Sequence, residues 1–441
     1  MKKIFLILLV TFLIPVKRII ILSIYFAFVF QISSTAYSQQ SKFDTSGPNA
    51  KVMGGDSNFS TCPRYGDHWT KLECRIGNIS ESNKIIGGVM RTVTPSKDVL
   101  NLKFIQNSPQ ELINKVDKYI SKHPVMGFLV IKNGEIVVER YQYGRTQDMI
   151  FRGMSMSKTV TALLIGIAQS KGFINSLDDK VEKYWPEIKN SPYGGVTIKE
   201  LLLMNSGVEG GNYDSETLMQ HQYYSILLKN ENYQKPEKFI EYLNNLKSRG
   251  TKGKYRYSNL DTIILGRVLH KATGKNISNL TSEWLWQPMG AKDISKWLYN
   301  NTDNLEWTEA GFTSTLNDFG RLGILLANDG KYKNTQVVPY NFLLEATDVN
   351  KLPKSNIQSG NNYAFQNVYG YQTWVLPNKE RTFCALGHYT QVICVQPSSK
   401  IVMVQVAANL SHVSFKKSFG NMANDLEPLW KEILKDLGGT N

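Results

Sequence analysis

One apolar stretch, residues 151–172, constrains the fold of this chain most strongly. It reads FRGMSMSKTVTALLIGIAQSKG, and no charged residue separates Lys158 from Lys171. Such a segment predicts a helix that is buried in the middle of a domain. Residues three apart share a helix face, so Ser155 and Lys158 should lie side by side at its N-terminal end. A buried amine could accept the serine proton; a capping serine followed by a surface lysine is the alternative interpretation.

Length and composition favour an enzyme-sized folded unit. The 441 residues are 42% hydrophobic and 20% charged, and no fixed-period repeat is visible. The formal net charge is +14. A basic run between Lys229 and Arg256 lacks the aromatic and basic pattern of an RNA-binding sheet, so we expect no nucleic-acid partner. We interpret it as a solvated face with a weak attraction to the anionic cell envelope.

The first 38 residues predict export. Lys2 and Lys3 precede two apolar runs, and each run is shorter than the roughly 20 residues that span a bilayer as a helix. The small residues Ala36 and Ser38 resemble a cleavage site. We expect a signal peptide over residues 1–38 and a periplasmic or secreted mature protein. An uncleaved N-terminal membrane anchor is the alternative.

Four cysteines fit an exported protein. Cys62 and Cys74 bracket a short loop, and Cys384 and Cys394 flank the centre of a predicted hairpin. Two local disulfides are therefore the simplest of three pairings, with free buried thiols as the alternative for the second pair. Neither pair has zinc spacing with histidines, and the six histidines are scattered, so we expect no metal site and no cofactor.

The chain after the signal peptide divides into an arm and one large domain. Residues 39–101 are rich in Ser, Gly, Asn and Pro, and we interpret them as an irregular N-terminal arm. The domain should cover residues 102–441. It opens with a helical pattern, and FLVIK and EIVVERY then surround Asn133-Gly134, which predicts a hairpin over residues 127–143. Three more strands, TFCALG, QVICVQP and KIVMVQVAAN, precede a C-terminal amphipathic helix.

Helical and loop patterns dominate between the hairpin and the late strands. Thr197 and Glu200 form a capping box at a helix start, and residues 209–250 are either a substrate-facing lid or a simple surface excursion. Tyr257 and Asn259 stand just ahead of another helix, so in an extended segment they would face the same side. Asn259 could instead be that helix's N-cap. Near a lysine, Tyr257 could lose its proton more readily and then accept the serine proton.

Three motifs now stand in one order along the chain, namely Ser155-Met156-Ser157-Lys158, Tyr257-Ser258-Asn259 and Gly387-His388-Tyr389-Thr390-Gln391. They resemble motifs of the serine β-lactamase and penicillin-binding protein superfamily. The similarity is to class C β-lactamase-like hydrolases, which include esterases, D-aminopeptidases and 6-aminohexanoate-dimer hydrolases. It runs from about Leu112 to Leu437. It implies an α+β, β-lactamase/transpeptidase-like fold, with an antiparallel sheet flanked by helices, an all-helical subdomain at about 170–310, and the active site between them.

The resemblance also implies a role for each site residue. Ser155 would form the acyl-enzyme, and Lys158 would be its proton partner. Tyr257 would be a general base or proton shuttle, and Asn259 would hold Lys158 or the substrate amide. The backbone N–H groups of Ser155 and Gln391 would hold the oxyanion. Whether Lys158 or Tyr257 takes the first proton stays open.

The triplet His388-Tyr389-Thr390 departs from the β-lactamase pattern, in which Lys-Thr-Gly or Lys-Ser-Gly supplies a lysine for the substrate carboxylate. His388 is neutral for much of the time near pH 7, so a constant positive charge is missing. Many esterase and amidase relatives carry His-x-Gly, which His388 fits and Thr390 does not. His388 could also be a turn residue without a role.

These observations predict an exported serine hydrolase that acts on a small ester or amide through an acyl-enzyme. Two alternatives remain. One is a penicillin-recognising D-Ala-type peptidase or β-lactamase, against which the missing lysine argues. The other is a non-catalytic envelope binding protein of the same fold.

Overall fold

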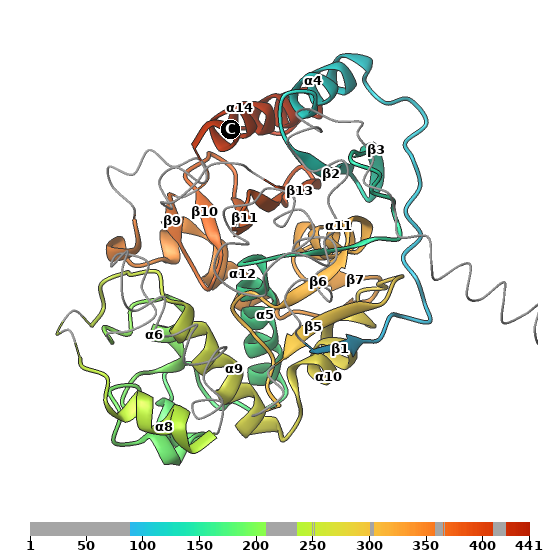
Figure 1. The fold of residues 1–441 in the computed structure, drawn as a ribbon. Coiled ribbons are helices and arrows are strands. Elements are labelled where there is room, and N and C mark those ends of the chain that lie inside the picture. Colours follow the sequence, from blue (N-terminus) through green and yellow to red (C-terminus); the bar gives the residue numbers. More distant parts are fainter. Residues whose placement is uncertain are drawn as a thin grey trace, which may run out of the picture. The chain divides into compact units, whose positions relative to one another are not determined.

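The computed structural model describes residues 89–208, 236–248, 250, 252–299, 304–357, 365, 367–408 and 420–441. Its largest sheet is antiparallel and has seven strands, and it lies below α4 (Gln110–Ile120) and α14 (Gly420–Asp436) in Figure 1. Its strand order is β3-β2-β13-β12-β11-β10-β9. The β2–β13 pairing joins the N-terminal hairpin to the C-terminal strands. The strands are β2 (Val125–Lys132), β3 (Glu135–Tyr141), β9 (Val368–Tyr369), β10 (Trp374–Leu376), β11 (Thr382–Gly387), β12 (Gln391–Gln396) and β13 (Ile401–Ala407).

The predicted hairpin is confirmed. Asn133 and Gly134 join β2 and β3 with φ angles of 53° and 83°, which are the left-handed values that a two-residue hairpin turn requires. All residues of β11, β12 and β13 are buried, because helices cover both faces of the sheet. Continuous apolar runs such as IVMVQVA suit strands in that position.

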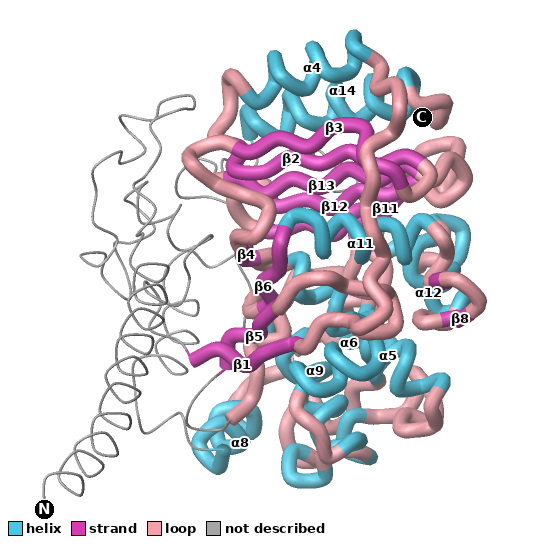
Figure 2. Tube along the Cα trace, turned by 90° about the vertical axis from the view of Figure 1, so that its right-hand side faces the viewer, coloured by secondary structure: helices cyan, strands magenta, loops and turns pink. Residues whose placement is uncertain are grey.

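Two helices cover each face of this sheet (Figure 2). On one face lie α4 (Gln110–Ile120) and α14 (Gly420–Asp436), whose buried side chains share one apolar core with the strands. On the other face, α11 (Leu316–Ala327) lies against β2, β12 and β13, and α5 (Met156–Ser170) lies against β11 and β12. Helix α5 is the predicted apolar helix, and its residues from Met156 to Ala168 are all buried.

A second, four-stranded sheet corrects two predictions. Its order is β1-β5-β6-β4, formed by β1 (Val89–Val93), β5 (Ser295–Tyr299), β6 (Phe312–Thr315) and β4 (Ile150–Arg152). Strand β1 falls within residues 39–101, so the described end of the arm is not wholly irregular: it pairs with β5, and Arg91 binds Glu306 at 2.8 Å. Strand β5 falls within residues 170–310, so this part is not all-helical. The buried Trp297 anchors β5 in the core.

The remaining described elements are mostly short helices. The capping box is confirmed, because the Thr197 side chain accepts from the Glu200 N–H and the Glu200 carboxylate accepts from the Thr197 N–H. The helices are α6 (Ile198–Leu202), α8 (Pro236–Asn244), α9 (Asn259–Thr273), α10 (Ile277–Leu280), α12 (Tyr340–Thr347), a π-helical turn (Thr281–Trp286) and 3-10 turns at Val181–Lys183, Pro186–Ile188, Val349–Lys351 and Lys354–Asn356; β7 (Lys331–Tyr332) and β8 (Thr335–Gln336) form a small hairpin.

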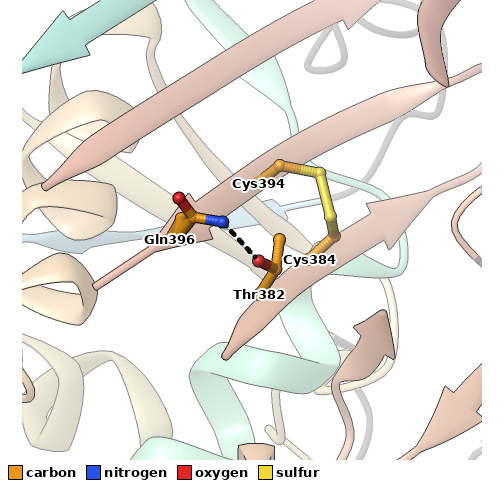
Figure 3. Close-up of a disulfide and its surroundings, with 4 residues drawn as sticks. All are labelled: Thr382, Cys384, Cys394 and Gln396. Carbon is orange, nitrogen blue, oxygen red and sulfur yellow. Dashed lines mark hydrogen bonds between the residues drawn. A yellow bond between two sulfur atoms is a disulfide. The ribbon is translucent and has the colours of Figure 1, made fainter. Parts of the chain in front are cut away.

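Cys384 and Cys394 form a disulfide across β11 and β12 (Figure 3). The two residues are direct partners in the register of these strands, and both are fully buried. Two residues along the same strands, the Gln396 amide donates to the Thr382 hydroxyl at 2.9 Å. The predicted second disulfide is thus confirmed, and the free-thiol alternative is wrong.

Several predictions fall on residues outside the described ranges. These are the signal peptide, the Cys62–Cys74 pair and most of the segment 209–250. Among the residues that are described, no helix is both long enough and apolar enough to span a bilayer.

Candidate active site

A tight turn between β4 and α5 presents Ser155. Met154 has a φ of 51°, and Ser155 occupies the position just before the first residue of α5. The turn is fixed to β6 twice, because the Gly153 N–H donates to the Phe312 carbonyl at 2.8 Å and the Phe312 N–H donates to the Ser157 hydroxyl at 2.9 Å. The serine is therefore held at the helix N-terminus, where the helix dipole stabilises negative charge.

Lys158 lies one turn into α5 and contacts Ser155. Its Nζ donates to the Ser155 Oγ at 2.9 Å and to the Glu309 carbonyl oxygen at 2.8 Å. The side chain is 1% exposed, and this burial lowers the pKa of Lys158 from its ordinary value of about 10.5 to about 7, while the Glu309 carboxylate acts in the opposite direction. Because of this lowered pKa, a neutral amine is available at neutral pH beside a hydroxyl.

Tyr257 comes to the same place from the segment ahead of α9. The centre of its ring lies 5.0 Å from the Lys158 Nζ. The ring stacks on Trp374 of β10, with 6.2 Å between ring centres and 11° between planes, and meets Tyr369 edge-on at 5.8 Å. The predicted convergence of serine, lysine and tyrosine from two distant parts of the chain is confirmed.

Asn259 is not the N-cap of α9. The cap is Ser258, whose hydroxyl accepts from the Asp261 N–H at 3.3 Å, and Asn259 is the first helical residue. The helix begins one residue earlier than the cap interpretation required, because serine is an equally good cap. Asn259 is buried, and its role in holding Lys158 or substrate stays a prediction.

The triplet His388-Tyr389-Thr390 lies in the turn that connects β11 to β12, between the two predicted strands. Tyr389 and Thr390 have φ angles of 63° and 67°, which interrupt an extended backbone. At a β-branched residue this conformation is strained, and glycine would adopt it freely. The turn therefore retains a geometry that suits the glycine of the family pattern.

The end of β11 touches the serine turn. A Cβ placed on Gly387 would lie 2.3 Å from the Gly153 carbonyl oxygen, so only glycine allows this approach. His388 follows directly and is partly exposed, with its ring 4.2 Å from that of Tyr389. The strand edge and the nucleophile turn are thus in backbone contact, as an oxyanion site shared between them requires.

Gln391 is the first residue of β12, and its side chain is engaged inside the sheet. Its amide donates to the Ala407 carbonyl at 2.6 Å, and its side-chain oxygen accepts from the Ala407 N–H at 3.0 Å. These contacts fix the start of β12 against β13. Donation to an oxyanion by the Gln391 backbone N–H stays a prediction.

Sequence reasoning missed Glu309 and Trp374. Glu309 stands in a turn just before β6, where the sequence shows no periodicity that would single out one carboxyl group. Trp374 belongs to a strand of only three residues, which is too short for periodicity to reveal. No three His, Cys, Asp or Glu side chains within the described ranges gather closely enough to hold a metal ion.

Comparison with known proteins decides the family. The family model described as "Beta-lactamase" matches residues 112–423, which is most of the chain. The protein belongs to the β-lactamase family. This family comprises serine hydrolases of the β-lactamase fold, so the chain is a member of an enzyme family with esterase and amidase homologues. The predicted resemblance and the α+β fold are confirmed.

Relatives of this β-lactamase family member are distant in sequence. The 6-aminohexanoate-dimer hydrolase of Paenarthrobacter ureafaciens is 22% identical over 318 residues, covering 71% of this chain and 79% of the relative. The solved structure of a Bacillus anthracis protein, described as a candidate 6-aminohexanoate-dimer hydrolase, matches with a TM-score of 0.68 at 21% identity, covering 86% of this chain and 96% of that one. A family VIII carboxylesterase structure matches with a TM-score of 0.53 at 17% identity, covering 75% and 99%. At these identities the structures show a shared fold.

Proposed function

We propose that this protein is an exported serine hydrolase that cleaves a small ester or amide through an acyl-enzyme on Ser155. The observation that carries the proposal is the 2.9 Å contact between the Ser155 hydroxyl and the Lys158 amine, whose pKa burial lowers to about 7. A serine needs a base within hydrogen-bond reach to act as a nucleophile, and a base is most useful when its pKa lies near the working pH.

The proposed reaction begins with the neutral Lys158 amine. It takes the Ser155 proton as the serine oxygen attacks the substrate carbonyl carbon. The oxyanion that forms is held by the backbone N–H groups of Ser155 and Gln391. The Lys158 ammonium then gives its proton to the leaving alcohol or amine, and the acyl-enzyme remains. Water then attacks the carbonyl carbon of this ester, and Lys158 or Tyr257 accepts a proton from the water. The same base gives that proton to the Ser155 oxygen as the carboxylic acid leaves.

His388 supports an ester or amide over a penicillin as the substrate. A β-lactam carries a carboxylate that a fixed positive charge would attract, and a histidine in place of the family's lysine is not a constant positive charge. The named relatives, a 6-aminohexanoate-dimer hydrolase and a carboxylesterase, support small acyl compounds as the substrate class.

Export is supported by the buried Cys384–Cys394 disulfide, because stable disulfides are rare in a reducing cytosol. The N-terminal apolar runs supply the leader or, alternatively, an anchor. Fractionation of cells that express the full chain tests this part. A mature protein beginning after Ser38 in the periplasm or medium is expected, whereas a full-length protein in the cytosol would contradict it.

The catalytic part is tested by labelling with a fluorophosphonate and locating the adduct by mass spectrometry. We expect an adduct on Ser155, and none there in Ser155→Ala. Ser170→Ala is the matched control, since Ser170 lies at the other end of α5 and its hydroxyl donates to the Ile167 carbonyl of the same helix. An unlabelled Ser155 in the wild-type protein would refute the proposal. Among short esters, D-amino-acid amides and nitrocefin, rapid turnover of nitrocefin alone would favour the β-lactamase alternative.

A further inference from the structure

Glu309 is a buried carboxyl group to which the proposed reaction gives no role. The residue is 2% exposed, and its buried Oε2 has no hydrogen-bond partner among the described residues. Burying an ionisable group without a hydrogen-bond partner costs folding free energy, so the presence of Glu309 beside Lys158 calls for a physical reason.

The segment that carries Glu309 is rigidly attached to the catalytic helix. The Lys158 Nζ donates to the Glu309 carbonyl at 2.8 Å, and the Thr161 hydroxyl of α5 donates to the Thr308 carbonyl at 3.0 Å. From β4, the Arg152 Nε donates to the Ala310 carbonyl at 3.1 Å. Three consecutive carbonyl groups are thus fixed, so the backbone that carries the carboxyl group is held directly against the amine.

Helix α9 fixes the same segment from its other side. The Thr308 hydroxyl donates to the Thr262 carbonyl at 3.1 Å. This contact depends on Gly266, because a Cβ there would lie 2.5 Å from the Thr308 methyl group. Glu309 is therefore held between α5, which carries Ser155 and Lys158, and α9, which follows Tyr257.

Three cations act on the Glu309 carboxyl group. Burial raises the pKa of Glu309, and the positive charges of Lys158, Arg152 and Arg267 lower it. Arg152 comes from β4 and Arg267 from α9, so the two guanidinium groups belong to different elements. Burial is the largest of these effects, so the pKa of Glu309 is raised, and the cations oppose that shift by favouring the carboxylate form.

We propose that Glu309 is a positioning residue whose carboxylate stabilises the Lys158 ammonium that forms when Ser155 gives up its proton. The inference rests on the proposed function and adds a residue to it. The Ser155 hydroxyl and the Tyr257 ring also face the amine, but neither carries a fixed negative charge. Glu309 thus supplies the charge that keeps the buried lysine basic enough to accept a proton.

The test compares three purified variants of the full chain. Glu309→Gln keeps the shape and removes the charge, and Glu309→Asp keeps the charge one methylene farther back. Glu306→Gln is the matched control, because Glu306 is also buried and stands three residues earlier, but it binds Arg91 and the Ser278 hydroxyl. The readouts are the pH dependence of kcat/KM and the titration of Lys158, followed by NMR in protein labelled with 13C at the lysine ε-carbon.

We expect Glu309→Gln to lower the apparent pKa of Lys158, and with it the acidic limb of kcat/KM, by about one pH unit. The value of kcat should fall about tenfold with little change in KM, because a less basic amine accepts the proton less well. Glu309→Asp should lie between Glu309→Gln and wild type. Glu306→Gln should lower the unfolding temperature and leave the acidic limb of kcat/KM at the same pH.

The inference would be overturned if Glu309→Gln changed neither the apparent pKa on the acidic side of the kcat/KM profile nor the midpoint of the Lys158 NMR titration. If that variant does not fold, the Lys158 titration in Glu309→Asp decides in its place, and an unchanged midpoint there overturns the inference too. The NMR titration needs no turnover. Failure of the proposed function, seen as an unlabelled Ser155, is therefore distinguished from failure of this inference.

Discussion

Replacing Lys158 by methionine should make the protein more stable and inactive, and the stability gain should depend on pH in a defined way. Methionine fills a similar volume without a charge. Activity should fall by about 10²–10⁴-fold, because the serine loses its proton acceptor. The two hydrogen bonds to Ser155 and the Glu309 carbonyl are lost as well, each worth about 1 kcal/mol, and this loss offsets part of the gain in stability.

The pH dependence follows from the lowered pKa of Lys158, which is about 7 in the folded protein against about 10.5 ordinarily. Between these values the unfolded chain binds a proton that the folded protein does not bind. The wild type therefore loses stability as the pH falls from 10.5 to 7, and the loss is complete below 7. Each pH unit in this window corresponds to about 1.4 kcal/mol. Between pH 9.5 and pH 7.0, the difference in the free energy of unfolding between Lys158→Met and wild type should therefore grow by about 3 kcal/mol in favour of the variant.

Urea titrations followed by tryptophan fluorescence at several pH values measure this difference in the free energy of unfolding. Lys171→Met is a control, since Lys171 is exposed at the end of the same helix. Its difference from wild type should stay constant over the window. A Lys158→Met difference that also stays constant would mean that Lys158 titrates near its ordinary pKa, and the account of the base would be refuted.

Three further substitutions test how the site is built. Gly387→Ala should lower stability by about 1–3 kcal/mol and activity at least tenfold, because its Cβ would press on the Gly153 carbonyl; Gly195→Ala, where a Cβ meets nothing within 4 Å, is the control, and equal effects would contradict the contact. Trp374→Ala should lower the stability measured by thermal unfolding by about 3–5 kcal/mol and lower kcat by releasing Tyr257, whereas Trp374→Phe should keep most of the stability and of kcat. Identical kcat values for Trp374→Ala and Trp374→Phe would argue against a supporting role for the Trp374 ring. The Cys384→Ala/Cys394→Ala double variant should lose about 3 kcal/mol, since the disulfide closes a loop with a separation of 10 residues; unchanged urea unfolding would show that it constrains nothing.

Local sequence signals predicted the elements that support the site. The Asn-Gly turn, the apolar helix and the three late strands each carry a periodicity or a turn residue that acts within a few positions, and each is present as expected. Ser155 and Lys158 were predictable for the same reason, since three residues along a helix fix their contact. The Cys384–Cys394 pairing follows from the hairpin register.

Features that depend on tertiary contacts were not predictable. Strands β1 and β5 pair across about two hundred residues, and neither carries a turn signal that points to the other. The turn at Tyr389 and Thr390 places two non-glycine residues at positive φ, which local preference disfavours. Glu309 meets Lys158 only because β6 and α9 hold its segment against α5.

The rate at which a fluorophosphonate labels Ser155, measured from pH 5 to pH 10, tests the central claim most directly. We expect the rate constant to rise about tenfold per pH unit up to about pH 7 and to be level above it, because Lys158 becomes neutral with a pKa of about 7. A rate constant that keeps rising to pH 10, as an ordinary lysine would give, or one that is flat throughout, would contradict it.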